Sequence, residues 1–339
     1  MLKKLSVVLL CLVLTITLFG CGGSNQPAKS GGDATQPIKI KVACDNVSGG
    51  PWDAGFKEFM RLVEEKVPGK VEFQYYPDGQ LSNNDQRTTM EMIQTGGVHI
   101  AAFLPSIYEQ FDQRWSIYGM PYLFTSIEEA RASCDGEAGK YMLGLLEEKG
   151  IHGLALWEQG MRHLTTSKKA VRVPADIAGM KIRVMDSPSF IEMMKQLNAL
   201  PLVTSMGELY TALQQGAADG QENPITTIYD RKLYEAQDYV TLTGHVYNPL
   251  ILGINKAFWE TLPADIQQAI SEAAVEATPF QRKAGEDLEA QKLDALKQAV
   301  EVIELTPEEI AQWKEATKGV APKFKDVIGQ EILDLFGIK

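Results

Sequence analysis

The chain has 339 residues and a formal net charge of -11, with 45% hydrophobic and 23% charged residues. No basic patch interleaved with aromatic residues stands out in this acidic chain, so we expect no nucleic-acid partner. About 300 residues follow the low-complexity N-terminal part, which is enough for two domains of ordinary size.

The first 21 residues have the pattern of an export signal. Lys3 and Lys4 precede the uncharged run "LSVVLLCLVLTITLF", which is shorter than a membrane span of about 20 residues but suits a signal-peptide core. The following "LFGC" resembles a bacterial lipobox, whose cysteine is lipidated and becomes the first mature residue. An ordinary signal peptide or an uncleaved anchor is the alternative. We predict a lipoprotein signal peptide over 1–21 with Cys21 lipidated, and hence an extracytoplasmic protein anchored to a membrane.

Residues 22–37, "GGSNQPAKSGGDATQP", lack apolar periodicity and are rich in Gly, Ser, Pro and Gln. Such a segment cannot bury enough apolar surface to order itself. We therefore predict a flexible tether between the anchor and the folded body.

Strands and helices alternate in the next part of the chain. The apolar patterns predict strands over 38–45, 70–77 and 98–105, with helices over 52–67 and 84–96 between them. This alternation is typical of an α/β fold with a mostly parallel sheet.

A second alternation begins near residue 150. It continues through the strand "KIRVM", the helix "SPSFIEMMKQLN", the strand "PLVTS" and the helix "GELYTALQQG". Two α/β lobes with a cleft between them are therefore expected, with ligands bound beyond the carboxyl ends of the strands. The polar run "GQENP" would then contribute Gln221, Glu222 and Asn223 to the cleft wall.

The C-terminal third is mainly helical. A helix starting near Pro263 and running to about residue 300 is long enough to extend along both lobes. Pro279 lies inside it, and a proline in a helix interior removes a hydrogen bond, so we expect a kink or a break there.

The sequence contains no G-x-S-x-G, P-loop, G-x-G-x-x-G or H-E-x-x-H motif. The four histidines, His99, His152, His163 and His245, lack metal-ligand spacing, and we expect neither a metal nor another cofactor. Catalytic groups can come together from distant positions, so an enzyme is not excluded on this ground. The cysteines Cys44 and Cys134 follow the signal; export permits a disulfide, but the sequence leaves open whether they pair.

Arg183 stands out in the strand "AGMKIRVMD". One interpretation makes it a surface charge on an exposed strand face. The other points it into the cleft, where its planar fork would hold a carboxylate through two hydrogen bonds. The residue pattern alone leaves both open.

From residue 38 to about residue 305 the chain resembles the substrate-binding proteins of tripartite ATP-independent periplasmic (TRAP) transporters. The matching segments occur in the family's order: "YYPDGQL", "PYLF", "GMRHLTTSKKAVRVPADIAGMKIRV", "GELYTALQQGAADGQENP" and "LYEAQDYVTLTGHVY". The resemblance implies two α/β lobes, joined by crossing strands and a long helix, that close over an organic acid. On this basis we expect one lobe over 38–160 and 249–288 and the other over 161–248 and 289–339.

The resemblance also implies a set of ligand-binding residues. The family's carboxylate-binding arginine falls on Arg183, and its asparagine of "QENP" falls on Asn223. The arginine of the "G-x-R-x-L-T-T" segment falls on Arg162. Asn46 after the first strand and Gln86 at the helix start after "GQL" complete the expected site.

Two positions depart from the family pattern. Many relatives have a phenylalanine that packs on the ligand where this chain has Met206, which packs well but stacks poorly. Asp186 stands where some sialic-acid binders have asparagine, and a carboxylate there would favour ligands with hydroxyl or amine donors. Alternatively, Asp186 caps the following helix.

We therefore expect a binding protein rather than an enzyme, one that passes an organic acid to the small and large membrane subunits of a TRAP transporter. The ligand would be a C4-dicarboxylate or a sugar acid. A sensory protein that presents the bound acid to a receptor is the main alternative. A secreted lyase or hydrolase using Asp45, Glu158 or Glu222 is a third.

Overall fold

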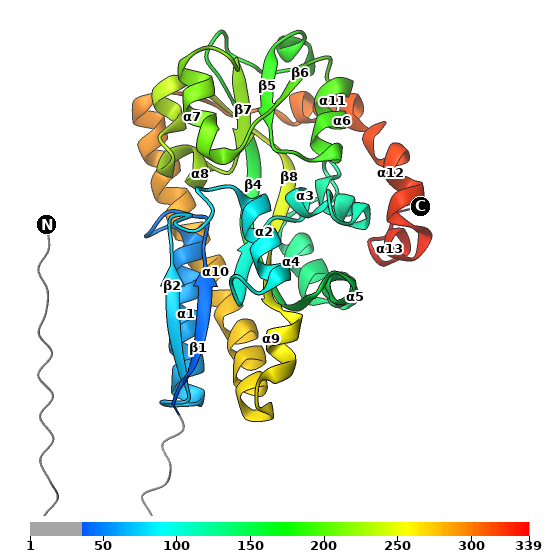
Figure 1. Cartoon of the computed structure of the whole chain (residues 1–339). Coiled ribbons are helices and arrows are strands. Elements are labelled where there is room, and N and C mark those ends of the chain that lie inside the picture. Colours follow the sequence, from blue (N-terminus) through cyan, green and yellow to red (C-terminus); the bar gives the residue numbers. More distant parts are fainter. Residues whose placement is uncertain (1–35, 339) are drawn as a thin grey trace, which may run out of the picture. The chain divides into compact units, whose positions relative to one another are not determined.

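The computed structural model describes residues 36–338 (Figure 1), and its nine strands form one continuous mixed sheet. The order is β2-β1-β3-β8-β4-β7-β5-β6, with β9 paired to β8. The strands are β1 Ile38–Ala43, β2 Val71–Tyr76, β3 Ile100–Phe103, β4 Ile151–Thr166, β5 Lys181–Val184, β6 Leu200–Val203, β7 Gly220–Asn223, β8 Tyr239–Asn255 and β9 Glu301–Ile303.

Helices cover the sheet and connect its strands. The α-helices are α1 Pro51–Lys66, α2 Gln86–Thr95, α3 Pro105–Tyr108, α4 Ile127–Asp135, α5 Glu137–Leu145, α6 Pro188–Gln196, α7 Met206–Gln214, α8 Ile225–Asp230, α9 Lys256–Thr261, α10 Ala264–Ala299, α11 Pro307–Thr317, α12 Val320–Ile328 and α13 Gln330–Leu335. The 3-10 helices are η1 Gln113–Gly119, η2 Leu146–Lys149, η3 Pro174–Ile177 and η4 Leu233–Ala236.

The predicted signal peptide, Cys21 and the tether up to residue 35 lie outside the described residues. Within the part that is described, no helix is both long and apolar enough to cross a bilayer. Cys44 and Cys134 are both buried and free, so the disulfide left open by the sequence does not form here.

The two-lobed α/β fold expected from the sequence is confirmed, and two long strands join its halves. β4 and β8 pair antiparallel from Ile151↔Asn255 to Thr166↔Tyr239. At one end β8 pairs with β3, beside the parallel strands β1 and β2. At the other end β4 pairs with β7, beside the parallel strands β5 and β6. The sheet is therefore parallel within each half and antiparallel where the crossing strands meet.

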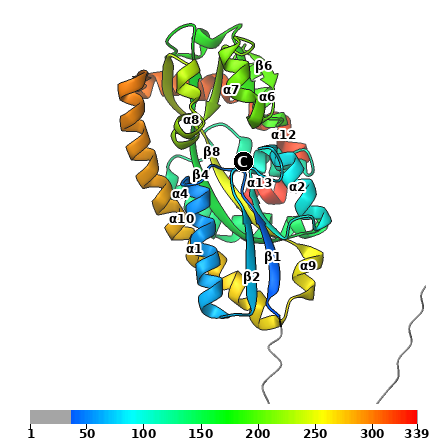
Figure 2. The ribbon, with the colours of Figure 1, turned by 60° about the vertical axis from the view of Figure 1, so that its left-hand side comes forward.

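The long helix α10 lies against α1 and β4 along one part and against α8 along another, so it ties the two halves together (Figure 2). It continues without interruption through Pro279, so of the kink or break expected there the break is wrong, and the kink stays a prediction. The carbonyl that loses its partner belongs to Val275, which is 63% exposed. Water can bond a carbonyl in such a position, which lowers the cost of the proline.

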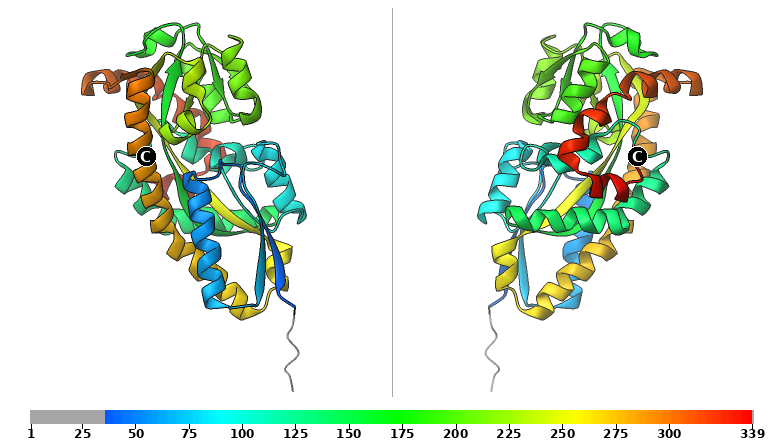
Figure 3. Two further views of the ribbon diagram at one scale, coloured as in Figure 1. Left: turned by 90° about the vertical axis from the view of Figure 1, so that its left-hand side faces the viewer. Right: turned by 90° about the vertical axis from the view of Figure 1, so that its right-hand side faces the viewer.

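The last three helices return from one half to the other (Figure 3). α11 contacts α6 and β8, α12 contacts α6 and η1, and α13 contacts α5 and η1. The start of α11 is fixed by a capping box in which Thr306 and Glu309 bond each other's backbone N–H groups.

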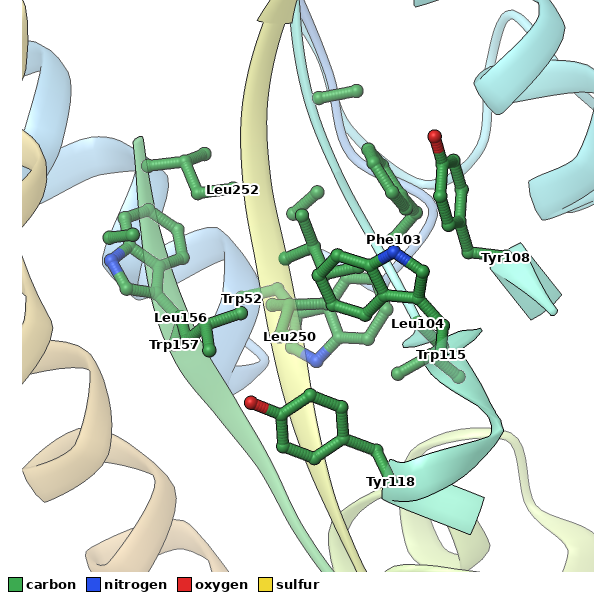
Figure 4. Close-up of a cluster of buried hydrophobic side chains, with 14 of the residues drawn as sticks. Trp52, Phe103, Leu104, Tyr108, Trp115, Tyr118, Leu156, Trp157, Leu250 and Leu252 are labelled. Atoms are coloured by element: carbon green, nitrogen blue, oxygen red, sulfur yellow. The ribbon is translucent and has the colours of Figure 1, made fainter. Parts of the chain in front are cut away.

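Aromatic side chains fill the core beside the crossing strands (Figure 4). Trp115 of η1 packs edge-on against Tyr108 of α3 at a centroid distance of 5.6 Å, and Trp157 of β4 packs edge-on against Phe56 of α1 at 5.3 Å. Such pairs contribute about 0.5–1.5 kcal/mol each beyond their buried area. The pair of Trp115 and Tyr108 packs η1 against α3, and the segment between these helices carries Gln110, which lines the cavity.

Candidate functional site

A cavity of about 320 Å³ lies where several strands and helices end. Six of the seven expected ligand-binding residues line it: Gln86, Arg162, Arg183, Asp186, Met206 and Asn223. The seventh, Asn46, is not among the lining residues; its Oδ1 accepts a hydrogen bond of 2.7 Å from the backbone N–H of Val47.

Arg183 lies on β5 and is only 2% exposed, so the interpretation of a surface charge is wrong. Its Nε and Nη2 both donate to the backbone oxygen of Thr204, at 3.0 and 2.6 Å. Burial lowers the pKa of Arg183 to about 10, so the side chain keeps its charge at neutral pH.

The three buried arginines of the described region differ in their partners. Arg162 pairs with Glu222, and Arg282 pairs with Asp135 at 2.7 Å. Arg183 has no carboxylate within ion-pair distance. Because a buried charge without a counter-ion is costly, the wall around Arg183 is suited to receive an anion.

Arg162 on β4 is held by protein groups on every side. Its Nε and Nη2 donate to the carboxylate of Glu222, and Nη2 also donates to Asn223 Oδ1 at 3.0 Å. Its Nη1 donates to Gln159 Oε1 at 3.1 Å. Burial raises the pKa of Glu222, but the charge of Arg162 and the hydrogen bonds from His245 and Arg162 together outweigh this, so the pKa falls below its usual value. Glu222 therefore stays ionised, and its negative charge balances the positive charge of Arg162.

The first four residues of the polar run "GQENP" form the buried strand β7, and Pro224 is the N-cap residue of α8. Its Asn223 pairs with His163 of β4, and its Gln221 pairs with Arg183 of β5. Gly220 is needed at the start of the strand, since a Cβ there would lie 2.3 Å from the backbone oxygen of Thr165. Asn223 lines the cavity as expected, but Gln221 and Glu222 are not among its lining residues, so their expected place in the cleft wall is wrong. Both are fully buried, because β7 lies between β4 and β5 in the sheet.

A chain of hydrogen bonds fixes the amide of Asn223. Its Nδ2 donates to Gln221 Oε1 at 2.5 Å, and Gln221 Nε2 donates to Thr165 Oγ1 at 3.0 Å. An amide nitrogen carries two N–H groups, so a second donor of Asn223 is available to a ligand.

Gln86 and Met206 stand at the first residues of α2 and α7. Gln86 Oε1 accepts from the backbone N–H of Leu104 at 3.2 Å, which fixes this side chain in the cavity lining. Met206 is half-buried and adds a flexible apolar contact to the lining.

Asp186 lies in the lining just after β5, and its side chain is 51% exposed. Gln110 Nε2 donates to its Oδ1 at 3.1 Å and to its backbone oxygen at 3.2 Å. The N-cap residue of α6 is Ser187, whose hydroxyl accepts from Phe190, so the capping role considered for Asp186 is wrong.

The sequence did not point to several lining residues, among them Arg87, Gln110 and Thr204. Thr204 follows the last residue of β6, so its place at a strand end was the signal that could have found it. Across residues 36–338 no group of three His, Cys, Asp or Glu side chains could hold a metal ion.

The sequence model of the bacterial extracellular solute-binding protein family 7, DctP, matches residues 46–326. The C4-dicarboxylate-binding periplasmic protein DctP of Rhodobacter capsulatus is 32% identical over 88% of this chain and 90% of its own length. A TRAP periplasmic solute-binding protein of Shewanella oneidensis with bound succinate superposes with a TM-score of 0.84 at 28% identity, covering 88% of this chain and 98% of that one. A TRAP periplasmic solute-binding protein of a Polaromonas species bound to D-erythronate gives a TM-score of 0.84 at 30% identity, over 89% and 99% of the two chains.

Proposed function

The chain belongs to family 7 of the bacterial extracellular solute-binding proteins, and we propose that Arg183 and Asn223 form its clamp for the carboxylate of a small organic acid. It is an extracytoplasmic binding protein of the TRAP type. The ligand classes named for its relatives, C4-dicarboxylates and the sugar acid erythronate, are the classes we propose for this chain.

One observation carries this proposal: Arg183 is buried, charged, without a carboxylate partner, and part of the cavity wall. The backbone oxygen of Thr204 takes two N–H groups of its guanidinium, and the others are left for a ligand. A carboxylate placed there gains a charge-assisted bond from Arg183 and a second bond from the amide of Asn223.

Binding would be coupled to movement of the lobes. We propose lobes over 38–160 with 249–288 and over 161–248 with 289–339. The pairing of β4 and β8 has three register shifts, and the middle one, between Glu158 and Gly160 and opposite Pro249 and Asn248, lies at this boundary and supports the division. An irregularity in the crossing strands is a natural place for them to bend. The acid would stabilise the closed form by contacting both lobes.

We further propose that Cys21 carries a lipid anchor, on the basis of the lipobox-like "LFGC". Family membership supports the proposal that the closed protein delivers its ligand to the small and large TRAP membrane subunits. We propose that the protein performs no covalent chemistry: none of the three acid–base candidates, Asp45, Glu158 and Glu222, is among the residues that line the cavity.

A thermal-shift screen tests the proposal directly. Carboxylic acids, including succinate and D-erythronate, are compared with their neutral amides, which have nearly the same shape but no negative charge. At least one acid should raise the unfolding temperature, whereas its amide should not. Equal shifts for acid and amide, or no shift with any acid, would contradict a carboxylate clamp.

A further inference from the structure

A second set of polar side chains lines the same cavity and bears on which acid fits. Asp186, Gln110 and Arg87 come from three different segments and meet at the wall. Gln110 fixes the Asp186 carboxylate, and Arg87 Nη1 lies 4.0 Å from it. This set would face the part of the ligand that Arg183 does not hold.

Two of the three arginines that line the cavity already have a carboxylate partner in the protein. Arg162 pairs with Glu222. Arg87 donates to Glu91 at 3.2 Å and also faces Asp186. Arg183 is the cation of this wall without a carboxylate within ion-pair distance, so the cavity can neutralise one ligand carboxylate.

The three carboxylates that line the cavity differ in the hydrogen bonds that they already accept from the protein. Asp85 and Glu208 cap the starts of α2 and α7 through backbone N–H groups. Asp186 does not cap α6, and its side chain is 51% exposed. Gln110 donates to its Oδ1, whereas Arg87 comes only within 4.0 Å of its Oδ2, so Oδ2 can accept a further hydrogen bond. An ionised carboxylate accepts hydrogen bonds and cannot donate them. It therefore attracts a hydroxyl and repels a second carboxylate.

We infer that this protein selects a hydroxylated monocarboxylate over a dicarboxylate, with Asp186, held by Gln110, accepting a hydrogen bond from a ligand hydroxyl. The inference rests on the proposed function, since Arg183 must hold the single carboxylate. It names Asp186 as the residue that determines specificity in the remainder of the cavity.

Calorimetry with acids of equal chain length tests the inference. D-erythronate and succinate have four carbons each, and D-gluconate and adipate have six. We expect at least one hydroxy acid to bind ten-fold or more tighter than its dicarboxylate counterpart. In Asp186→Asn this ratio should fall at least ten-fold, because the amide still bonds a hydroxyl but no longer repels an anion.

Asp287→Asn is the matched control. It changes the net charge by the same amount at an exposed position on α10 outside the lining, and it should leave the ratio unchanged. A dicarboxylate that binds as tightly as the hydroxy acid, or an unchanged ratio in Asp186→Asn, overturns the inference.

Arg183→Ala separates this failure from failure of the proposed function. If a dicarboxylate is preferred and its binding is lost in Arg183→Ala, the carboxylate clamp stands and only the role of Asp186 is wrong. If none of the four acids binds, or if the tightest binds Arg183→Ala equally well, both proposals are contradicted.

Discussion

Arg183 donates two hydrogen bonds from its guanidinium to the backbone oxygen of Thr204, the residue that follows β6. This contact holds the plane of the guanidinium against the neighbouring strand end before any ligand arrives. A side chain fixed in this way loses little conformational freedom on binding, so more of the interaction energy appears as affinity.

The first prediction concerns the planar guanidinium of Arg183. Arg183→Ala should weaken binding of the acid by about 2–5 kcal/mol, since it removes one partner of a buried charge pair. Arg183→Lys keeps the charge but loses the planar fork, and it should also bind clearly more weakly. Calorimetry measures both, and circular dichroism checks that the variants are folded. Parental affinity in both variants would place the clamp elsewhere.

The sequence predicted the alternating elements of both lobes because their apolar residues recur at helical or strand spacing. It did not locate the full extent of β4 and β8, whose 16 and 17 residues are buried along most of their length. A strand buried on both faces has no polar side to reveal its period. The crossing strands were therefore expected only because the family resemblance implies them.

The lining residues of the candidate site were partly predictable from the sequence, but the contacts between them were not. Resemblance placed Arg183 and Asn223 in the cavity lining, but it could not show that Glu222 neutralises Arg162. That pair joins residues 60 positions apart through the pairing of β4 with β7. The Asp186–Gln110 contact also joins separate segments, so it depends on tertiary packing that no local pattern records.

The second prediction addresses the ion pair of Glu222 with Arg162. Both side chains are fully buried, so Glu222→Gln leaves an arginine charge without its partner and should lower the free energy of unfolding by about 3–5 kcal/mol. Glu65→Gln removes an exposed partner of Arg61 and should cost far less, because solvent screens surface ion pairs. Urea unfolding gives both values; equal small losses would show that the buried pair adds no stability.

The third prediction concerns Met206, which lines the cavity where many relatives have phenylalanine. Met206→Phe replaces a flexible side chain by a rigid ring, so it should change the order in which a panel of acids binds while the protein stays folded. Competition calorimetry across the panel measures this order. An unchanged order with unchanged affinities would show that Met206 makes no ligand contact.

The fourth prediction concerns the proposed anchor at Cys21. Serine lacks the thiol that lipidation requires, so Cys21→Ser should abolish incorporation of a labelled fatty acid. Ligand affinity should stay at its parental value, because Cys21 precedes the family match that begins at residue 46. Labelling that persists in the variant would mean that the N-terminal signal has been misassigned.

The last prediction is that the stability of the fold depends on pH through Glu109, which lies where the two halves of the fold meet. Glu109 follows α3 and is completely buried. Its carboxylate accepts hydrogen bonds from the Ser189 hydroxyl at 2.6 Å, the Ser189 backbone at 3.0 Å and the Ser187 hydroxyl at 3.0 Å. Gly119 permits this approach, since a Cβ there would lie 1.9 Å from Ser189 Oγ.

Burial raises the pKa of Glu109 from 4.5 to about 7, against the opposing effect of the serine hydrogen bonds. The folded state therefore holds this proton more tightly than the unfolded state. Its contribution to stability is complete below pH 4.5 and is lost as the pH rises through about 7. A difference of this size corresponds to about 3 kcal/mol in the free energy of unfolding.

Glu109→Gln should remove this contribution, so the variant should lose less stability than the parent between pH 5 and pH 8. Burial also raises the pKa of Glu289 to about 7, but Glu289 is present in both proteins and cancels in the comparison. Glu64→Gln, at an exposed position of α1, is the control and should keep the parental slope. Urea unfolding at both pH values gives the slopes. A parental slope in Glu109→Gln would show that Glu109 does not titrate on unfolding in this range.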